Sequence, residues 1–424
     1  MTIRCHRTHE ELLALAPRWN ELLQRSSSNA IFLTWEWVST WWAVFGRRFQ
    51  LLLLTAEDEN GQLIGIAPTM VGRRRSASGL TFRVLMFIGQ RGDTLAEYLD
   101  FIIQPGHEAE ITAAFCDFMQ RDLAAEWDCI FLERILTTSP NLPTLERKTS
   151  CPRFTALRDR ELRSPHAALG CTWAEFLAAK SRNFRNQWNN SWNRLQAAGD
   201  VQFLFGGNDV PLSTALTEVT RLHRERWEGR SASFSTEDYL DFHKQLSARF
   251  HANGWLLLLL LSVNGKNVAA RYDYIYAGKL WCMQGGWSPD HAAQRVGTLL
   301  TGKVIQWGIE HGLREYDFLG KASDYKRRWS DGERVMINLI ACNPRTFRGW
   351  VWKWNRVLEG LARRAKKRLR TKRMQPPQGT PSSSRRPLTA PTRPFFVSSS
   401  VPTPLPHGRC PPPPGSRHQA RIGT

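Results

Sequence analysis

The sequence predicts an α+β protein made of two copies of one small unit, followed by a helix and a tail. The first observation is a hairpin pattern that occurs twice. Residues 49–71 place the turn Asn60-Gly61 between two apolar runs, and residues 255–276 do the same around Asn264-Gly265. Asn-Gly between apolar runs is the strongest short-range signal for a β-hairpin. The other two observations are the order of the segments around each hairpin and a change of composition near the end of the chain.

The segments around each hairpin come in the same order, which indicates a duplication. Helices are expected before the hairpins, over 10–24, 34–45, 173–198 and 212–226. After each hairpin come a strand (83–89 or 280–286), an amphipathic helix (110–125 or 296–312) and a closing strand (127–135 or 314–320). This order predicts mixed, mostly antiparallel sheets in which the closing strand lies parallel to the strand before the helix. We place the two units at residues 1–150 and 165–345.

The last part of the chain differs in composition from the rest. No acidic residue follows Glu359, whereas 14 Lys and Arg lie from Arg363 to Arg421, so most of the +20 net charge is located there. Residues 346–370 combine apolar residues at helical spacing with basic residues toward the end, which predicts a basic terminal helix. Residues 371–424 hold 13 of the 23 prolines, and this Pro/Ser/Arg-rich tail is expected to be disordered and able to contact anionic partners. The body is only mildly basic, so no specific nucleic-acid partner is expected.

Cysteine spacing and hydropathy narrow the class of protein further. The eight cysteines are scattered singly with no Cys-x-x-Cys pair, so neither a metal site nor a disulfide framework is expected. No apolar run reaches the roughly 20 residues needed to span a bilayer, and the run Leu256–Leu261 is interpreted as a buried strand. The N-terminus lacks the apolar core of a signal peptide, so the expected location is the cytoplasm.

The loop before the second amphipathic helix is the candidate cofactor site. It contains Gln294, Arg295, Val296, Gly297 and Thr298, with the short pattern Arg295-x-Gly297. A helix N-terminus with small residues offers free N–H groups and partial positive charge, which suit a pyrophosphate. The alternative is that this loop is simply a turn and a helix cap. The first half has no such basic-glycine pattern directly before its helix, so any cofactor site is expected in the second half.

The segment after the last closing strand supplies the candidate catalytic residues Asp317, Tyr325 and Lys326. Tyr325 offers an O–H that is able to protonate a leaving thiolate, and Lys326 a cation for phosphate or carboxylate. Asp317 lies inside an apolar strand, where it must either face a site or satisfy backbone donors. The alternative is a solvated basic loop over packed aromatic residues.

A helical stretch in the second half provides His223, Arg226 and Trp227 as candidates for acceptor binding. A second basic helix carries Lys180, Arg182 and Arg185. Such residues more often form solvated or packed helix faces than sites. No Walker loop, HExxH sequence or hydrolase elbow occurs, which argues against several hydrolase classes.

A set of short motifs also occurs in a fixed order along residues 20–345. They are Phe32-Leu33-Thr34-Trp35-Glu36-Trp37, Trp41-Trp42, Gly65-Ile66-Ala67-Pro68, Phe87-Ile88-Gly89, residues 223–227, the loop ending at Gly297, residues 316–320, Tyr325-Lys326 and Trp329. This set resembles the GNAT superfamily of N-acetyltransferases, in particular the cellulose-biosynthesis (CelD-like) branch. The resemblance implies tandem GNAT-like (acyl-CoA N-acyltransferase) folds, with a first unit that is not catalytic. It is similar in plan to the Fem-type transferases.

The resemblance implies direct transfer of an acetyl or other acyl group from acyl-CoA to an amine or hydroxyl of a small-molecule or saccharide acceptor, with no metal. The family pattern at the cofactor loop is matched in part, since Gln294-x-x-Gly297 is present and Leu299 occupies the last small position. A role in polysaccharide or cell-envelope biosynthesis follows from the family label alone. Two other functions stay open: a Fem-type transferase that uses aminoacyl-tRNA, and a non-catalytic component of a polysaccharide-synthesis assembly.

Overall fold

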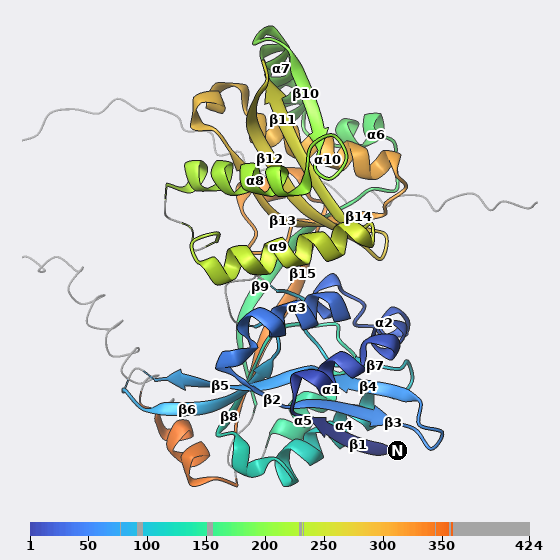
Figure 1. Ribbon diagram of the computed structural model, residues 1–424, viewed down its shortest axis with the longest axis vertical. Coiled ribbons are helices and arrows are strands. Elements are labelled where there is room, and N and C mark those ends of the chain that lie inside the picture. The colour runs from blue at the N-terminus through green and yellow to red at the C-terminus, as the bar shows by residue number, and fades with distance from the viewer. Residues whose placement is uncertain are drawn as a thin grey trace, which may run out of the picture. The chain divides into compact units, whose positions relative to one another are not determined.

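The computed structural model describes residues 1–76, 78–90, 96–150, 156–228, 231, 233–343, 345–355 and 358 (Figure 1). Residues 1–367 form one compact unit. Of the predicted terminal helix, residues 347–355 are helical, and most of the remainder lies outside the described residues, as does the whole tail predicted from 371 to 424. In the described part of the chain, no helix is both long and apolar enough to cross a membrane.

The first half of the chain mixes strands and helices in the predicted order. Its strands are β1 (Thr2–His6), β2 (Gln50–Leu51), β3 (Leu53–Glu57), β4 (Leu63–Ala67), β5 (Thr69–Arg75), β6 (Thr81–Phe87), β7 (Ile102–Ile103), β8 (Cys129–Leu136) and β9 (Leu157–Ala168). Its helices are α1 (His9–Ala14), α2 (Ala16–Arg25), α3 (Trp35–Phe45), α4 (Glu108–Arg121) and α5 (Leu142–Thr149), with short 3-10 turns at Ile31–Leu33, Gly46–Arg48 and Ala124–Glu126.

The second half repeats the plan. Its strands are β10 (Val201–Phe205), β11 (Leu256–Val263), β12 (Lys266–Tyr276), β13 (Lys279–Trp287), β14 (Glu315–Asp317) and β15 (Gly332–Cys342). Its helices are α6 (Trp173–Ala178), α7 (Arg182–Ala197), α8 (Leu212–Trp227), α9 (Glu237–Ala252), α10 (Val296–Glu310) and α11 (Asp324–Trp329), with a 3-10 helix η4 (Pro289–Gln294) before α10.

Two predicted helices are each split in the structure, and the helices α5, α9 and α11 were not predicted. The segment 10–24 forms α1 and α2, which meet beside Pro17, a residue that has no N–H for a continuous helix. The segment 173–198 forms α6 and α7, because the Ser181 hydroxyl accepts from the N–H of Phe184 and starts a new helix. Helix α9 was missed, although Thr236 caps it in the same way.

The described strands form a sheet of four, in the order β1-β3-β4-β7, and a sheet of eleven, in the order β10-β11-β12-β13-β14-β9-β15-β8-β6-β5-β2. In each half the closing strand lies parallel to the strand before the helix, β8 beside β6 and β14 beside β13, which confirms the α+β arrangement with mixed, mostly antiparallel sheets. The predicted strand Leu256–Leu261 is confirmed as β11. Leu257, Leu259 and Leu261 pack on the α10 side of the sheet, and Leu258 and Leu260 on the α8 side.

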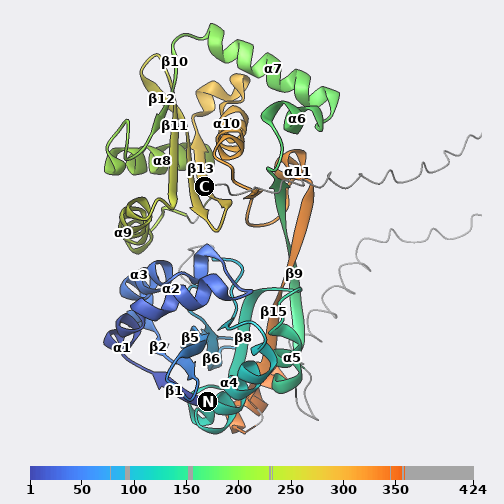
Figure 2. The ribbon, with the colours of Figure 1, turned by 90° about the vertical axis from the view of Figure 1, so that its right-hand side faces the viewer.

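The two halves complete each other's sheets by exchanging one strand each (Figure 2). Strand β9 of the first half pairs antiparallel with β14 of the second, with Asp317 opposite His166. Strand β15 of the second half pairs antiparallel with β8 of the first, with Ile340 opposite Phe131, and β9 and β15 pair with each other. The boundaries 1–150 and 165–345 stay a prediction, and the exchange explains why one sheet runs through both halves.

Two buried carboxylates connect the halves next to the exchanged strands. Glu97 of the first half accepts hydrogen bonds from the N–H of Gly320 at 2.9 and 3.0 Å. Asp317 accepts from Tyr98, also in the first half, from the hydroxyl of Ser164 at 3.1 Å, and from the N–H of Leu319 at 2.9 Å. Both carboxylates are almost completely buried. The first half therefore fixes the backbone that follows β14.

Helix α8 lies against β13 at a contact that requires glycine. A Cβ added to Gly286 would lie 2.2 Å from the backbone nitrogen of His223 and 2.2 Å from the carbonyl carbon of Leu222. No side-chain rotation relieves a clash with helix backbone, so α8 approaches the sheet this closely only over Gly286.

We expect Gly286→Ala to lower the free energy of unfolding by at least about 2 kcal/mol, because the helix has to move away from the sheet. Urea unfolding of the purified protein measures this. The matched control is Gly170→Ala, where the added Cβ meets nothing within 4 Å, and a change below about 0.5 kcal/mol is expected. Equal effects at the two positions would contradict the close approach of α8.

The buried Glu97 also makes the stability depend on pH. Burial raises the pKa of Glu97 to about 7 from 4.5, against the opposing effect of Arg134. Between these two pKa values, Glu97 holds a proton in the folded protein that it has lost in the unfolded chain. The free energy of unfolding therefore falls as the pH rises from about 4.5 to about 7.

Between pH 4.5 and pH 7.5, we expect the free energy of unfolding of Glu97→Gln to fall by about 3 kcal/mol less than that of the wild-type protein. Urea unfolding at pH 4.5 and at pH 7.5 measures it. The control Glu21→Gln changes an exposed partner of Arg25 and is expected to keep the wild-type slope. A Glu97→Gln protein with that same slope would show that Glu97 titrates as an ordinary carboxyl group.

Candidate active site

The candidate site is the gap where β13 and β14 diverge. The two strands pair in parallel over three residues only, from Lys279 beside Glu315 to Trp281 beside Asp317. Strand β13 continues to Trp287, whereas the chain after β14 turns away through Leu319 and Gly320, both with left-handed φ values of 49° and 60°. The divergence leaves the last part of β13 without a neighbouring strand on this side.

A cavity of about 320 Å³ lies at this end of β13. Residues from α8, β12, β13, α10 and α11 contribute to it, and the lining residues are Arg226, Ala270, Arg271, Gly285, Gly286, Trp287, Ala292, Arg295, Gly297, Thr298, Leu300, Tyr325 and Arg328. Four of these are arginines and none is Asp or Glu. A cavity with this lining favours anionic ligands.

The start of α10 forms one wall of the cavity. Arg295 caps the helix with a left-handed φ of 52°, and its guanidinium donates to the side chain of Gln187 on α7 at 2.6 Å. Gly297 and Thr298 line the cavity within the first turn, in which the N–H of Thr298 donates to the carbonyl of Arg295 at 2.8 Å. Of the predicted cofactor residues, Arg295, Gly297 and Thr298 thus come together.

The other two predicted cofactor residues do not line this cavity. The Val296 side chain is buried in the core beneath α10. The side-chain oxygen of Gln294 is buried and has no hydrogen-bond partner in the described part of the protein. Their assignment to the cofactor stays a prediction.

Tyr325 lies on α11 with its hydroxyl at the start of α10. The hydroxyl is 2.5 Å from the hydroxyl of Thr301 and donates to the carbonyl of Gly297 at 3.3 Å. Burial raises the pKa of Tyr325, and the positive charge of Arg271 opposes this rise. The phenol is therefore protonated at neutral pH and located in the cavity wall.

Lys326 and Asp317, the other predicted catalytic residues, point away from this cavity. The Lys326 ammonium group donates to the carbonyl of Leu319. Asp317 is completely buried, and its hydrogen bonds all go to protein groups, as described above. Both side chains hold the turn between β14 and α11, and neither lines the cavity that contains Tyr325.

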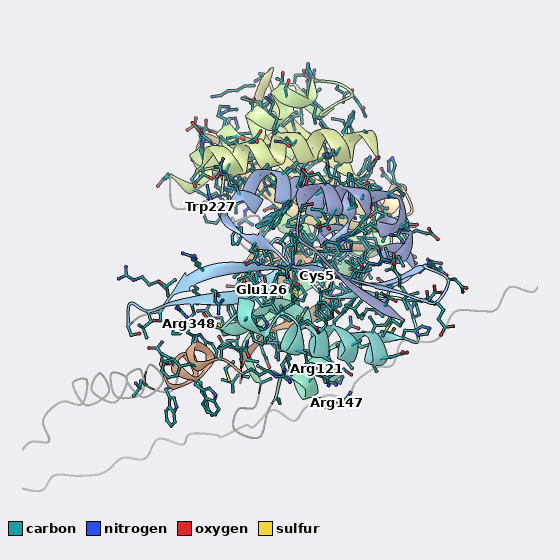
Figure 3. The ribbon with its side chains drawn as sticks, turned by 60° about the horizontal axis from the view of Figure 1, so that its bottom comes forward. Cys5, Arg121, Glu126, Arg147, Trp227 and Arg348 are labelled. Atoms are coloured by element: carbon teal, nitrogen blue, oxygen red, sulfur yellow. The ribbon has the colours of Figure 1, made fainter. Side chains whose placement is uncertain are left out.

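Of the three candidates for acceptor binding, only Arg226 lines the cavity. His223 is buried between α8 and β13, where its ring contacts the carbonyl of Gly285 at 3.3 Å and the hydroxyl of Ser231 at 3.1 Å. Burial lowers the pKa of His223 to about 4, so the ring is neutral at pH 7. Trp227, labelled in Figure 3, is 39% exposed. The Arg226 guanidinium lies over its ring, 4.9 Å from the ring centre.

Sequence reasoning missed a polar group at the base of the cavity, formed by Arg271, Asp273, Cys282 and Tyr316. Arg271 donates to Asp273 at 2.8 Å, contacts the Cys282 sulfur at 2.7 Å and bonds the Tyr316 hydroxyl. The available signal was an Arg and an Asp two residues apart within an apolar strand, which implies a buried ion pair on one face.

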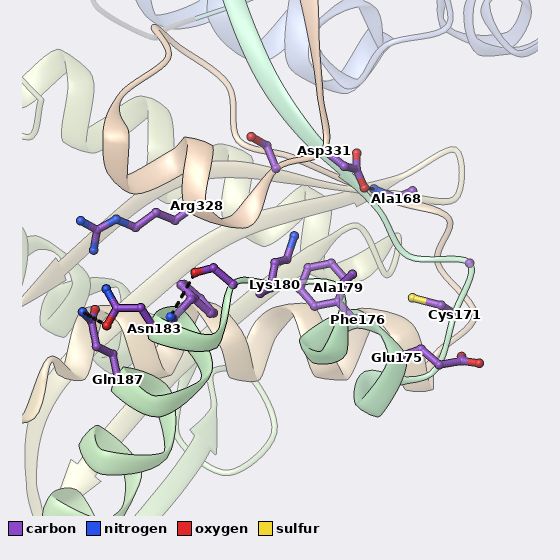
Figure 4. A pocket seen from close by; sticks show the side chains of 14 residues that line it. Ala168, Cys171, Glu175, Phe176, Ala179, Lys180, Asn183, Gln187, Arg328 and Asp331 are labelled. Carbon is purple, nitrogen blue, oxygen red and sulfur yellow. Dashed lines mark hydrogen bonds between the residues drawn. The ribbon is translucent and has the colours of Figure 1, made fainter. Parts of the chain in front are cut away.

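A larger cavity of about 700 Å³ lies beside α6 and α7 (Figure 4). Its polar groups are largely occupied: Lys180 donates to the carbonyl of Trp329 at 2.5 Å, and Asp331 accepts from the N–H of Ala168 at 3.0 Å. A small cavity between the two contains Gln187 and Arg328, which also line the larger one, and Arg295 and Tyr325, which also line the site. The three cavities therefore adjoin one another.

Residues 182–327 match the family described as "Acetyltransferase (GNAT) domain". No curated protein sequence matches the chain. Among solved structures, FemX matches with a TM-score of 0.55 at 12% identity, over 81% of this chain and 98% of that one. Two others have lower TM-scores. L-PGS from Bacillus licheniformis has 0.46 at 12% identity, over 80% and 95% of the two chains. A tandem GNAT protein from the clavulanic acid biosynthesis pathway has 0.44 at 10% identity, over 81% and 100%.

The match to the GNAT domain covers α7 to α11 and so contains the diverging strands, the start of α10 and Tyr325. The described residues contain no group of His, Cys, Asp and Glu that could hold a metal ion. The likeness to FemX concerns the fold and extends over both halves. The chain thus has a GNAT/Fem-like fold, and its residues 182–327 match the model of the GNAT acetyltransferase domain.

Proposed function

We propose that the protein is an acyltransferase that moves an acetyl or other acyl group from CoA to an amine or hydroxyl acceptor. The observation that carries this proposal is the arginine-lined cavity at the start of α10, with the Tyr325 hydroxyl in its wall. A CoA thioester has phosphates at one end and the reacting carbonyl at the other. The cavity offers cations and the positive end of the α10 dipole for the first and a proton donor for the second.

The phosphates are assigned to the outer end of the cavity. Arg295 and Arg328 lie where the site adjoins the small cavity, and Gly297 and Thr298 present the first turn of α10 between them. Arg328 is exposed and makes no ion pair with any described residue, so its charge is available to a ligand. These contacts would also hold the substrate in one orientation.

The transfer step follows from the position of Tyr325. The acceptor nitrogen or oxygen attacks the thioester carbonyl, the new bond to carbon forms, and the carbon–sulfur bond breaks. The sulfur takes the electron pair and then the proton of the Tyr325 hydroxyl, so CoA leaves as the thiol. The nearby charge of Arg271 stabilises the phenolate that remains, until the proton lost by the acceptor restores the phenol.

The remaining predicted site residues take positioning roles in this proposal. Asp317 and Lys326 hold the turn at Leu319, which leads into α11, and so fix the place of Tyr325. His223 holds α8 on β13 and with it Arg226. The first half contributes Glu97 and Tyr98 to the same turn and performs no chemistry.

Two other functions are tested against this one. The first is a Fem-type transferase that uses aminoacyl-tRNA, which is considered because the fold is shared with FemX. An arginine-lined cavity also suits nucleic-acid phosphates. A non-catalytic component of a polysaccharide-synthesis assembly would bind neither donor. Acceptors from polysaccharide or cell-envelope biosynthesis, and a cytoplasmic location, remain part of the proposal.

The first test is donor binding. We expect acetyl-CoA to raise the melting temperature of the purified protein, because a ligand that binds only the folded state stabilises it, by about 2.7 kcal/mol at a hundred times its Kd. Arg328→Glu should weaken the affinity about 10- to 100-fold by calorimetry, because it places a negative charge beside the phosphates. Arg194→Glu, on α7 outside the three cavities, should leave the affinity unchanged. Binding of aminoacyl-tRNA without acetyl-CoA binding would favour the Fem-type function.

The second test concerns Tyr325. We expect Tyr325→Phe to lower kcat about 100-fold, as the loss of a general acid does, while the Kd for acetyl-CoA changes less than about twofold. Because the pKa of Tyr325 is raised, its contribution should persist from pH 7 to pH 9. Tyr276→Phe is the control, since that hydroxyl is buried without a partner among the described residues. Undiminished turnover in Tyr325→Phe would exclude Tyr325 as the acid.

A further inference from the structure

Two arginines from different elements line the same cavity. Arg226 comes from α8 and Arg271 from β12, and both line the cavity together with Tyr325. Burial lowers the pKa of Arg226, and the positive charge of Arg271 lowers it further. Two cations held this close in a partly buried place repel each other, unless an anion lies between them.

Among the described residues, one carboxylate pairs with these two charges: Asp273, which forms an ion pair with Arg271. The hydrogen bonds of Arg271 run through one nitrogen, Nη2, which donates to Asp273, Cys282 and Tyr316. Its Nε is buried and has no hydrogen-bond partner in the described part of the chain. Arg271 is 8% exposed and lines the cavity, so a buried donor of a lining residue is left without an acceptor, a condition that native structures rarely keep.

Arg226 has no carboxylate partner among the residues that the structure describes. Within the described residues it forms no hydrogen bond and no ion pair, and its guanidinium lies 4.9 Å from the centre of the Trp227 ring and 5.8 Å from that of Trp287. The two rings fix the guanidinium plane by cation–π contact and leave its N–H groups free. Arg226 is therefore oriented in advance for an acceptor that the chain does not provide.

The position of this pair separates it from the phosphates. The proposed phosphate contacts, Arg295 and Arg328, line the small cavity toward α7, which does not include Arg226 or Arg271. Arg226 and Arg271 instead act electrostatically on Tyr325 and Cys282, at the end where β13 and β14 diverge. That end is where the thioester reacts in the proposed function.

We propose that Arg226 and Arg271 bind a carboxylate that the substrates carry beside the reacting atoms. A planar guanidinium matches a carboxylate in two parallel hydrogen bonds, which gives direction as well as charge. This inference rests on the proposed acyl transfer and specifies its substrates: the carboxylate belongs either to an amino-acid acceptor or to a dicarboxylic acyl group. The two sources share one chemistry, and the experiment distinguishes them.

The experiment compares matched probes that differ in one carboxylate, using the full chain and calorimetry. N-acetylglycine against N-acetylglycinamide, each with CoA, tests the acceptor side. Succinyl-CoA against acetyl-CoA tests the acyl side. We expect one of the carboxylate probes to bind at least about tenfold more tightly than its neutral counterpart. Arg226→Gln should reduce that preference to less than about twofold, and the control Arg194→Gln should retain it.

Other results would overturn the inference. One is no preference for either carboxylate probe. Another is a preference that persists in Arg226→Gln. A third is an equal loss of affinity for acetyl-CoA itself in Arg226→Gln, which would make Arg226 a phosphate contact. Failure of the proposed function looks different, because then neither CoA nor acetyl-CoA binds the wild-type protein, and titration of N-acetylglycine alone still reports on the arginine pair.

Discussion

The divergence of β13 from β14 is the constraint on which the rest of the site depends. Because the parallel pairing ends at Trp281 and Asp317, the remainder of β13 has no strand beside it, and the space is lined by side chains from five elements. Gly286 lets α8 come close enough to bring Arg226 to this space. The left-handed turn at Leu319 and Gly320 directs α11 back toward α10, which places Tyr325 opposite the first turn of that helix.

The first half takes part in the same geometry. Strand β9 pairs with β14 on the edge away from β13. Glu97 accepts from the N–H of Gly320, and Tyr98 donates to the carboxylate of Asp317. A buried carboxylate that accepts two or three hydrogen bonds is hard to move, because any shift leaves an unpaired charge. The turn before α11 is therefore held from both halves, and in the proposed function the first half serves as a scaffold for the site.

The order and type of the segments could be predicted from the sequence, whereas the side-chain contacts between distant segments could not. The hairpins, the parallel closing strands, the start of α10 and the approach of Tyr325 follow from segment order, which is local. Lys326 looked equivalent to Tyr325, but neighbouring residues on a helix point about 100° apart, and the Lys326 ammonium reaches Leu319 instead. The roles of Arg271 and Glu97 depend on which strands pair across the two halves, and periodicity in one segment does not contain that information.

The structure shows which basic residues of the body are paired with carboxylates, and the net charge alone does not indicate this. Many arginines in the described residues face a carboxylate, as Arg7 faces Glu126 and Arg334 faces Glu315, and such pairs leave little field for a ligand. Of the four arginines that line the cavity, only Arg271 forms an ion pair with a described carboxylate, and no lining residue is acidic. In the proposed function, these arginines bind a substrate pair that is anionic at both ends and uncharged at the reacting carbonyl. When both ends of the substrates are bound in this way, the binding energy holds the acceptor atom and the thioester carbonyl in the geometry that transfer requires.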